Sequence, residues 1–184
     1  MVISEYNGIW LKQFLEIDKI LRQNLSKIKT IEHVGSTAII GMYAKPIIDI
    51  IIVINNENDF DIIKNELEFT GYFHNGDQGI PGREAFKRKE NLDNNILDNF
   101  AHHLYVCTYE NSEFKRHILF RDYLNKYKEA RDQYNNIKHE ILKKVGYDNR
   151  KDYVDIKEKE YRWFFEGIIE KAEEENKQKK HNST

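Results

Sequence analysis

Asp49 is the first candidate for chemistry, because it is the only charged residue in an apolar, β-branched run over residues 47–54. Such a run is typical of a central strand that is buried on both faces. A carboxylate inside that strand is costly unless a cation, hydrogen-bond donors or a metal ion compensates its charge. The sequence therefore predicts a partner for Asp49.

Gly35 and Ser36 follow a short apolar strand predicted over residues 30–34. Glycine lets the backbone turn sharply or approach a ligand closely, and serine is a favourable N-cap for a short helical segment. Free N–H groups at such a start can bind an anion. The pair indicates a phosphate cradle beside Asp49; the alternative is an ordinary strand-to-helix turn in which Ser36 acts only as a cap.

The elements that would position these residues follow from the hydrophobic spacing. Helices are predicted over residues 7–28 and 57–70, and strands over residues 30–34, 47–54, 72–74, 83–90 and 101–109, with loops at 75–82 and 91–98. A third helix begins after Asn111 and Ser112, a fourth ends at Gly146, and a last one begins at Asp148 or Asn149. This order predicts an α+β fold with a small mixed β-sheet and flanking helices.

Composition limits the classes of partner. The 184 residues carry a formal net charge of −2, which gives no general basic field, so nucleic acid is not an expected partner. Cys107 is the only cysteine in the sequence, which excludes an intramolecular disulfide and favours a reducing compartment. Neither a signal sequence nor a window of transmembrane length is visible. We expect a cytoplasmic protein without a membrane partner, and the oligomeric state is not predicted.

The stretch that ends at Asp49 contains a set of residues at fixed spacing, namely His33, Gly35, Ser36, Thr37, Gly41, Lys45, Pro46 and Asp49. This pattern resembles the signature of the GrpB family, which is classed as an uncharacterised protein family. The resemblance continues through residues 79–83, 86–87, 103–106 and 120–124 and at Tyr153 and Lys157, so it covers roughly residues 10–165, which is most of the chain. The resemblance implies a nucleotidyltransferase-like core plus a C-terminal helical extension. We expect a single domain over residues 1–169 and a polar tail over residues 170–184 that is a fraying helix end or disordered.

The resemblance also implies roles for individual residues. In nucleotidyltransferases two carboxylates hold two magnesium ions that orient a triphosphate. Asp49 matches the first carboxylate, but Ile51 stands at the second position, so only weak magnesium binding is expected. His102 and His103 should point to opposite faces of a strand. His103 matches the family pattern and is the candidate general base, although a core or surface histidine is the alternative.

Basic residues from several elements could converge with Gly35 and Ser36 on one anion. The alternative is ordinary solvated charge, which we favour for Arg88 and Lys89. A second alternative pairs Asp49 with Lys45, Arg83 or Arg121 to organise the core. The candidate basic ligands are Lys45, Arg83, Lys87, Arg121 and Lys157.

Three functions remain open at this point. The first is transfer of a nucleotidyl group from a nucleoside triphosphate to an acceptor, with Asp49 and His103 as catalytic residues. The second is a non-catalytic module of the same fold that binds a phosphorylated or carboxylated small ligand, and the third is a structural protein. Ile51 favours the second function unless another carboxylate substitutes, for which Glu32 is the nearest candidate.

Overall fold

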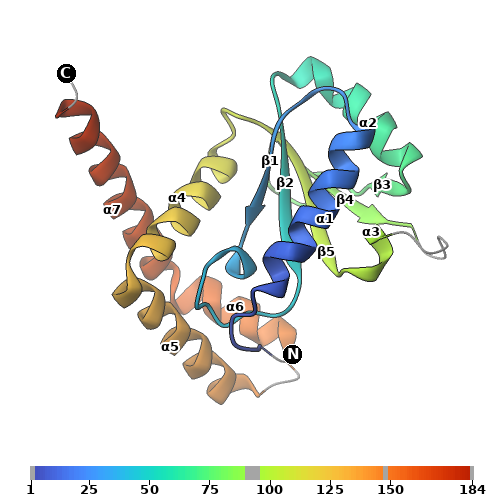
Figure 1. Ribbon diagram of the computed structural model, residues 1–184. Coiled ribbons are helices and arrows are strands. Elements are labelled where there is room, and N and C mark those ends of the chain that lie inside the picture. The colour runs from blue at the N-terminus through green and yellow to red at the C-terminus, as the bar shows by residue number, and fades with distance from the viewer. Residues whose placement is uncertain (1–2, 90–95, 147–148, 183–184) are drawn as a thin grey trace.

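A computed structural model describes residues 3–89, 96–146 and 149–182 (Figure 1). Its five-stranded sheet has the order β1-β2-β5-β4-β3. β2 and β5 are parallel, and the other neighbouring strands are antiparallel. The predicted small mixed sheet is therefore confirmed. Its strands are β1 (Ile28–Val34), β2 (Ile48–Ile54), β3 (Tyr72–His74), β4 (Arg83–Arg88) and β5 (His102–Thr108).

Different helices cover the two faces of the sheet. Apolar residues of α1 and α2 form one core cluster with the even-numbered residues of β2. On the opposite face, Phe114 of α4 packs against Ile51 and Val53. Figure 1 shows α4 to α7 gathered at one side of the molecule, away from α2 and β3. The helices are α1 (Ile9–Asn24), α2 (Phe60–Phe69), α3 (Ile96–Asn99), α4 (Ser112–Lys126), α5 (Lys128–Val145), α6 (Arg150–Glu160) and α7 (Arg162–His181), with short 3₁₀ turns η1 (Ser36–Ala38) and η2 (Glu57–Asp59).

β2 is the central strand that the apolar run predicts. Every residue from Ile50 to Ile54 is at most 2% exposed. The register pairs Asp49 with Val34 of β1 on one side and with His103 of β5 on the other. Because side chains alternate along a strand, Asp49 lies on the face that α4 covers, at the beginning of β2.

Helix boundaries differ from the sequence prediction near both ends of the chain. α1 ends at Asn24 rather than at Ile28, and Ile28 instead opens β1. Leu25 and Ile28 still pack against the core that α1 covers, so the apolar spacing continues past the end of the helix. At the C-terminus the prediction of one last helix was wrong, because a break at Tyr161 separates α6 from α7.

Other local predictions can be compared directly. Asn149 caps α6 by accepting a hydrogen bond from the backbone N–H of Asp152, as expected. Residues 91–95 of the predicted loop lie outside the described residues, and its last part forms the one-turn helix α3, because Leu97 is buried in the core.

Beyond residue 170 the chain stays helical to His181. No helix in the described ranges combines the length and the apolar character that crossing a membrane would require.

Candidate functional site

The turn between β1 and η1 is held directly against Asp49. Gly35 has φ of +70°, and a Cβ atom at this position would overlap Oδ2 of Asp49 and lie 3.0 Å from its Cγ. Only glycine meets both conditions. The N-cap of η1 is Gly35 and makes no side-chain cap, so the prediction that Ser36 caps the turn was wrong. Ser36 is instead the first residue of η1, and its hydroxyl accepts a hydrogen bond from Lys138.

His33 holds this turn through a hydrogen bond to Thr37. Thr37 Oγ1 donates to the carbonyl of Ile47 at 3.2 Å, so it accepts from Nε2–H of His33 at 3.0 Å. The His33 ring is buried and stacks on Phe14 with centroids 4.8 Å apart. Burial lowers the pKa of His33 to about 4, which keeps the ring neutral. His33 is therefore a positioning residue for the turn rather than a ligand-binding group.

Asp49 and His103 form a hydrogen-bonded pair across the parallel strands β2 and β5. Nδ1 of His103 lies 2.8 Å from Oδ1 of Asp49, and their side chains are 42% and 30% exposed. A carboxylate oxygen accepts, so the Nδ1 atom of His103 donates this hydrogen bond. Asp49 thereby orients His103. The proposed pairing of Asp49 with Lys45, Arg83 or Arg121 is not the arrangement that the structure shows.

A cavity of about 190 Å³ opens over Ser36 and Thr37 of η1, and Gly35 lines an adjoining cleft instead. Ser36, Asp49 and His103 line it, whereas Arg83, which we expected in the same site, does not. Lys45 and Lys157, both in the predicted basic set, also line it. The cavity therefore brings together one carboxylate, one imidazole, three amines and several hydroxyls. Its other walls come from α5 and α6.

Lys138 of α5 is the cavity residue that sequence reasoning missed. Its side chain is almost completely buried, at 3% exposure. Nζ donates to Ser36 Oγ at 2.8 Å and to the carbonyl of Tyr43 at 2.5 Å, and it lies 4.5 Å from the ring centroid of Tyr134. Burial, and then the charge of Lys157, lower the pKa of Lys138 to about 7. Its position on the apolar stripe, four residues after Tyr134 and three before Ile141, was the available signal.

Three predicted basic ligands do not line this cavity. Lys87 is exposed on β4. Arg83 is buried with its guanidinium 4.3 Å from the ring centroid of Tyr105, and its Nε has no hydrogen-bond partner among the described residues. Arg121 donates to Glu32 at 2.8 Å and to the carbonyl of His33 at 2.9 Å.

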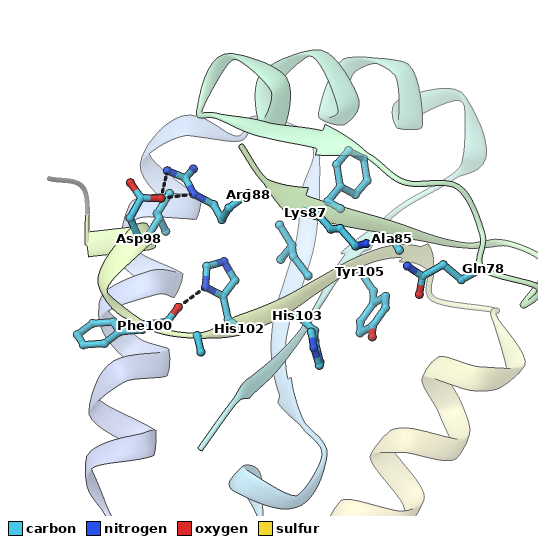
Figure 2. Close-up of a pocket in the computed structure, with 13 residues that line it drawn as sticks. Gln78, Ala85, Lys87, Arg88, Asp98, Phe100, His102, His103 and Tyr105 are labelled. Atoms are coloured by element: carbon cyan, nitrogen blue, oxygen red, sulfur yellow. Dashed lines mark hydrogen bonds and ion pairs between the residues drawn. The ribbon is translucent and has the colours of Figure 1, made fainter. Parts of the chain in front are cut away.

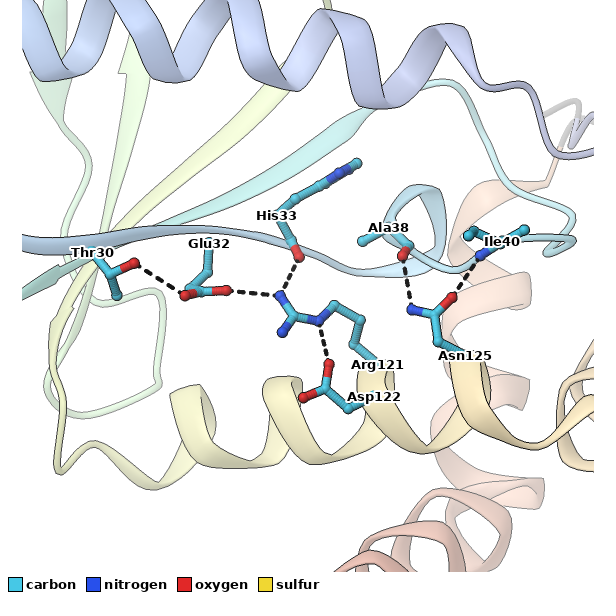
Figure 3. A network of polar contacts seen from close by, with 8 residues as sticks. All are labelled: Thr30, Glu32, His33, Ala38, Ile40, Arg121, Asp122 and Asn125. Atoms are coloured by element: carbon cyan, nitrogen blue, oxygen red, sulfur yellow. Dashed lines mark hydrogen bonds and ion pairs between the residues drawn. The ribbon is translucent and has the colours of Figure 1, made fainter.

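Figure 3 shows that Arg121 belongs to a structural network between α4 and β1. Asp122 accepts from Nε of Arg121 at 2.8 Å. Asn125, one turn later on α4, bonds to the backbone of Ala38 and Ile40 just after the turn. These contacts hold α4 to the signature segment. Arg121 is therefore committed to positioning, and its expected role as a phosphate ligand has no support from this geometry.

His102 and His103 point to opposite faces, as expected, and Figure 2 shows both at the edge of a cavity of about 550 Å³. Both nitrogens of His102 are within 2.7 Å of a partner, namely the hydroxyl of Tyr72 and the carbonyl of Phe100. Burial lowers the pKa of His102. His102 is thus the core histidine, whereas His103 lines both this cavity and the one over Ser36.

The side chains at Asp49 do not fit a two-metal centre. Magnesium prefers oxygen ligands in octahedral geometry, and one oxygen of Asp49 is already bonded to His103. Ile51 is fully buried in an apolar cluster. Glu32 lies opposite Ile51 but is bonded to Arg121. Among the described residues no three His, Cys, Asp or Glu side chains are grouped to hold a metal ion.

Two proteins of known structure have a similar arrangement of elements. The conserved protein GrpB from Enterococcus faecalis is similar with a TM-score of 0.76 and 26% identity, over 92% of this chain and 98% of that one. The Cid1 poly(U) polymerase, solved with the UTP analogue UMPNPP, is similar with a TM-score of 0.53 and 14% identity. That alignment covers 77% of this chain and 43% of Cid1. At this identity the likeness concerns the fold alone, which is nucleotidyltransferase-like.

Sequence comparison finds relatives that are named GrpB or UPF0157 proteins. The chain is 33% identical over 164 residues to the glutamate-rich protein GrpB of Alkalihalophilus pseudofirmus, covering 84% of this chain and 92% of that protein. It is 31% identical over 137 residues to the UPF0157 protein YqkA of Bacillus subtilis, covering 74% of this chain and 38% of YqkA. The profile of the family described as GrpB protein matches residues 1–169. The chain therefore belongs to the GrpB protein family.

Proposed function

We propose that the cavity over Ser36 binds the phosphate groups of a small phosphorylated ligand, with a nucleoside triphosphate as the ligand class. The observation that carries this proposal is the buried amine of Lys138. An ammonium group has three N–H donors, and two of them contact Ser36 and Tyr43. Among the described residues no carboxylate lies within ion-pair distance of Nζ, so a bound anion would supply the missing counter-charge.

The surroundings of Lys138 support an anionic occupant. Lys45 and Lys157 line the same cavity, and burial lowers the pKa of Lys157 as well. Amines that are desolvated and close to one another are unfavourable in the empty site, which is typical of residues retained for function. Ser36 adds a hydroxyl at the start of η1. The nucleotide class is supported by the fold, since Cid1 has been solved with a UTP analogue and with MgGTP.

Ligand-dependent stabilisation tests the proposal. Inorganic tripolyphosphate and ATP should each raise the melting temperature, with a stabilisation of about 2.7 kcal/mol at a hundredfold excess over the dissociation constant. Lys138→Met should abolish the rise, because methionine fills the space without the charge. Lys143→Met, at an exposed position on the same helix, should retain it. Equal ligand responses in the two variants, or none in the wild type, would contradict the proposal.

Magnesium enters the proposal only as a weakly held ion. Asp49 offers a single carboxylate, and one of its oxygens is bonded to His103. We expect calorimetric titration of the ligand-free protein with magnesium or manganese to give little heat at millimolar concentrations. Tight stoichiometric binding would show that the donor set at Asp49 is larger than the one described above.

The Asp49–His103 pair favours nucleotidyl transfer as a second candidate function. Nε2 of His103 would take the proton of an acceptor hydroxyl. The acceptor oxygen would then bond to the α-phosphorus, as the bond from that phosphorus to the bridging oxygen breaks and pyrophosphate leaves. Release of pyrophosphate from ATP, UTP, CTP or GTP with candidate hydroxyl acceptors measures this step. Activity that survives both His103→Ala and Asp49→Asn would exclude the pair from catalysis.

A cytoplasmic location and a small anionic partner complete the proposed function. Both rest on the inferences drawn from composition and on the chemistry of the cavity. Fractionation of cells that express the tagged chain would test the location directly.

A further inference from the structure

The lysine-lined cavity is too small for a whole nucleotide. Its volume is about 190 Å³, whereas pockets for drug-sized ligands usually measure about 300–1,000 Å³. A second cleft of about 660 Å³ adjoins it and shares four lining residues: Ser36, Asp49, Tyr134 and Lys157. A ligand with its phosphates over Ser36 would therefore extend into this cleft, which lies between α4 and the α6–α7 pair.

The walls of the second cleft are suited to a flat ring. Phe120 of α4 and Phe165 of α7 line it and are stacked on each other, with centroids 5.2 Å apart. Ile80 and Ile169 add apolar surface. Aromatic walls of this kind favour planar ligands through offset-stacked or edge-on contacts.

Charged side chains in the cleft largely neutralise one another. Arg116 makes two hydrogen bonds of 3.0 Å to the carboxylate of Glu166, and Arg162 lies 3.6 Å from the same carboxylate. Paired charges offer little attraction to a second anion. The cleft thus differs from the lysine-lined cavity, and the two together match a ligand with one anionic end and one uncharged end.

His117 supplies a polar group within this aromatic setting. It lies on α4, three residues before Phe120, and lines the cleft. Its ring makes no hydrogen bond to any of the described residues. Burial lowers the pKa of His117, although the charge of Asp49 opposes this, so the neutral imidazole offers one donor and one acceptor. Those two groups match the edge of a heterocyclic base.

We propose that the cleft between α4 and α7 binds the nucleobase of the ligand, with Phe165 as its aromatic contact and His117 as its edge contact. This inference rests on the proposed phosphate site. It adds a binding site for the base of the ligand, which the phosphate site alone does not identify. A simple polyphosphate would occupy only the lysine-lined cavity.

Calorimetric titration at constant pH separates the two proposals. The probes are inorganic tripolyphosphate, ATP, GTP, CTP and UTP. At least one nucleoside triphosphate should bind tenfold or more tightly than tripolyphosphate. Phe165→Ala should reduce that ratio below about threefold and leave the affinity for tripolyphosphate unchanged. Trp163→Ala is the matched control, because Trp163 lies on the same helix, is 61% exposed and does not line the cleft.

His117 gives a test that does not depend on the packing of Phe165. His117→Ala should lower the affinity for the preferred nucleotide five- to tenfold, and His117→Asn, which keeps a donor and an acceptor, should recover part of it. Tripolyphosphate binding with no preference for nucleotides overturns the base site alone. A nucleotide preference that survives both Phe165→Ala and His117→Ala also overturns it. Absence of binding by every probe overturns the phosphate site and the base site together.

Discussion

The two faces of β2 differ in polarity and in burial. The face towards α1 and α2 presents Ile48, Ile50 and Ile52 to one continuous apolar core. The face towards α4 begins with Asp49, and only from Ile51 onward is it apolar. Because the first face supplies burial along the whole strand, the second can leave its first position polar and partly open. The site therefore lies where the helical cover of the sheet ends.

The neighbouring histidines repeat this difference at the level of single residues. His102 points to the covered face and has both nitrogens bonded. His103 points to the open face, has one nitrogen bonded to Asp49 and lines two cavities. Residue type alone does not separate the two. Their burial and their partners do, and both follow from the alternation of the strand.

Substitutions at the adjacent β2 positions 49 and 50 should give the largest difference in stability between the two faces. Ile50→Ala should lower the free energy of unfolding by about 2–5 kcal/mol, because it leaves a cavity in a fully buried site. Asp49→Asn keeps an acceptor for His103 and should lower it by less than about 1 kcal/mol. Urea denaturation of both variants measures the difference. A loss at Asp49→Asn as large as that at Ile50→Ala would make Asp49 a structural residue.

Gly35 and Gly76 form a second pair for comparison, because both have φ of +70°. Alanine at Gly35 or at Gly76 should lower the free energy of unfolding by about 1–3 kcal/mol through backbone strain. A Cβ at Gly35 would also displace the carboxylate of Asp49, whereas nothing lies within 4 Å of one at Gly76. Gly35→Ala alone should therefore abolish binding of tripolyphosphate in calorimetry. Intact binding in Gly35→Ala would show that the turn is not part of the site.

Replacing each histidine tests the two faces separately. His102→Ala leaves the hydroxyl of the buried Tyr72 without its partner, which should lower the free energy of unfolding by about 1–3 kcal/mol. His103→Ala should lower it by less than about 1 kcal/mol, since its ring is 42% exposed,. Thermal melts of both variants supply the comparison. The reverse order of stabilities would mean that the open face, not the covered one, holds the sheet together.

Much of this arrangement could be predicted from sequence because its causes are local. The β-branched run specifies β2, and the Gly35–Ser36 turn lies within fifteen residues of Asp49 in the chain. The family resemblance identified His103, which the structure places beside Asp49. The break at Tyr161 could not be predicted, because the apolar spacing is similar on both sides of it.

The residues that sequence reasoning misplaced depend on long-range packing. Lys138 is 102 residues from Ser36, and its neighbours in sequence, Lys143 and Lys144, are exposed. Arg121 matched the basic pattern, but the approach of α4 to β1 directs it to Glu32. The way in which the helices meet the sheet decides which lysine is buried and which arginine is paired. The periodicity of a single sequence carries no information about that packing.

The pH dependence of stability gives a further expected difference between the two faces of β2. Burial and Lys157 lower the pKa of Lys138 in the folded chain from 10.5 to about 7. Between these two values the unfolded chain holds more protons at this residue, so its contribution to stability rises with pH and is lost as pH falls towards 7. One residue titrating in this way adds a slope of at most about 1.4 kcal/mol per pH unit. The covered face has no equivalent group in β2.

Urea denaturation at intervals between pH 7 and pH 9 would measure this slope. Lys138→Met should flatten it and should leave the ligand-free protein as stable as the wild type or more stable at pH 7, since the cost of burying an amine is removed. Lys143→Met should keep the wild-type slope. Saturating tripolyphosphate should stabilise the charged amine and flatten the wild-type slope as well. A slope that neither Lys138→Met nor tripolyphosphate changes would mean that this amine is charged in the empty site and takes up no proton with the ligand.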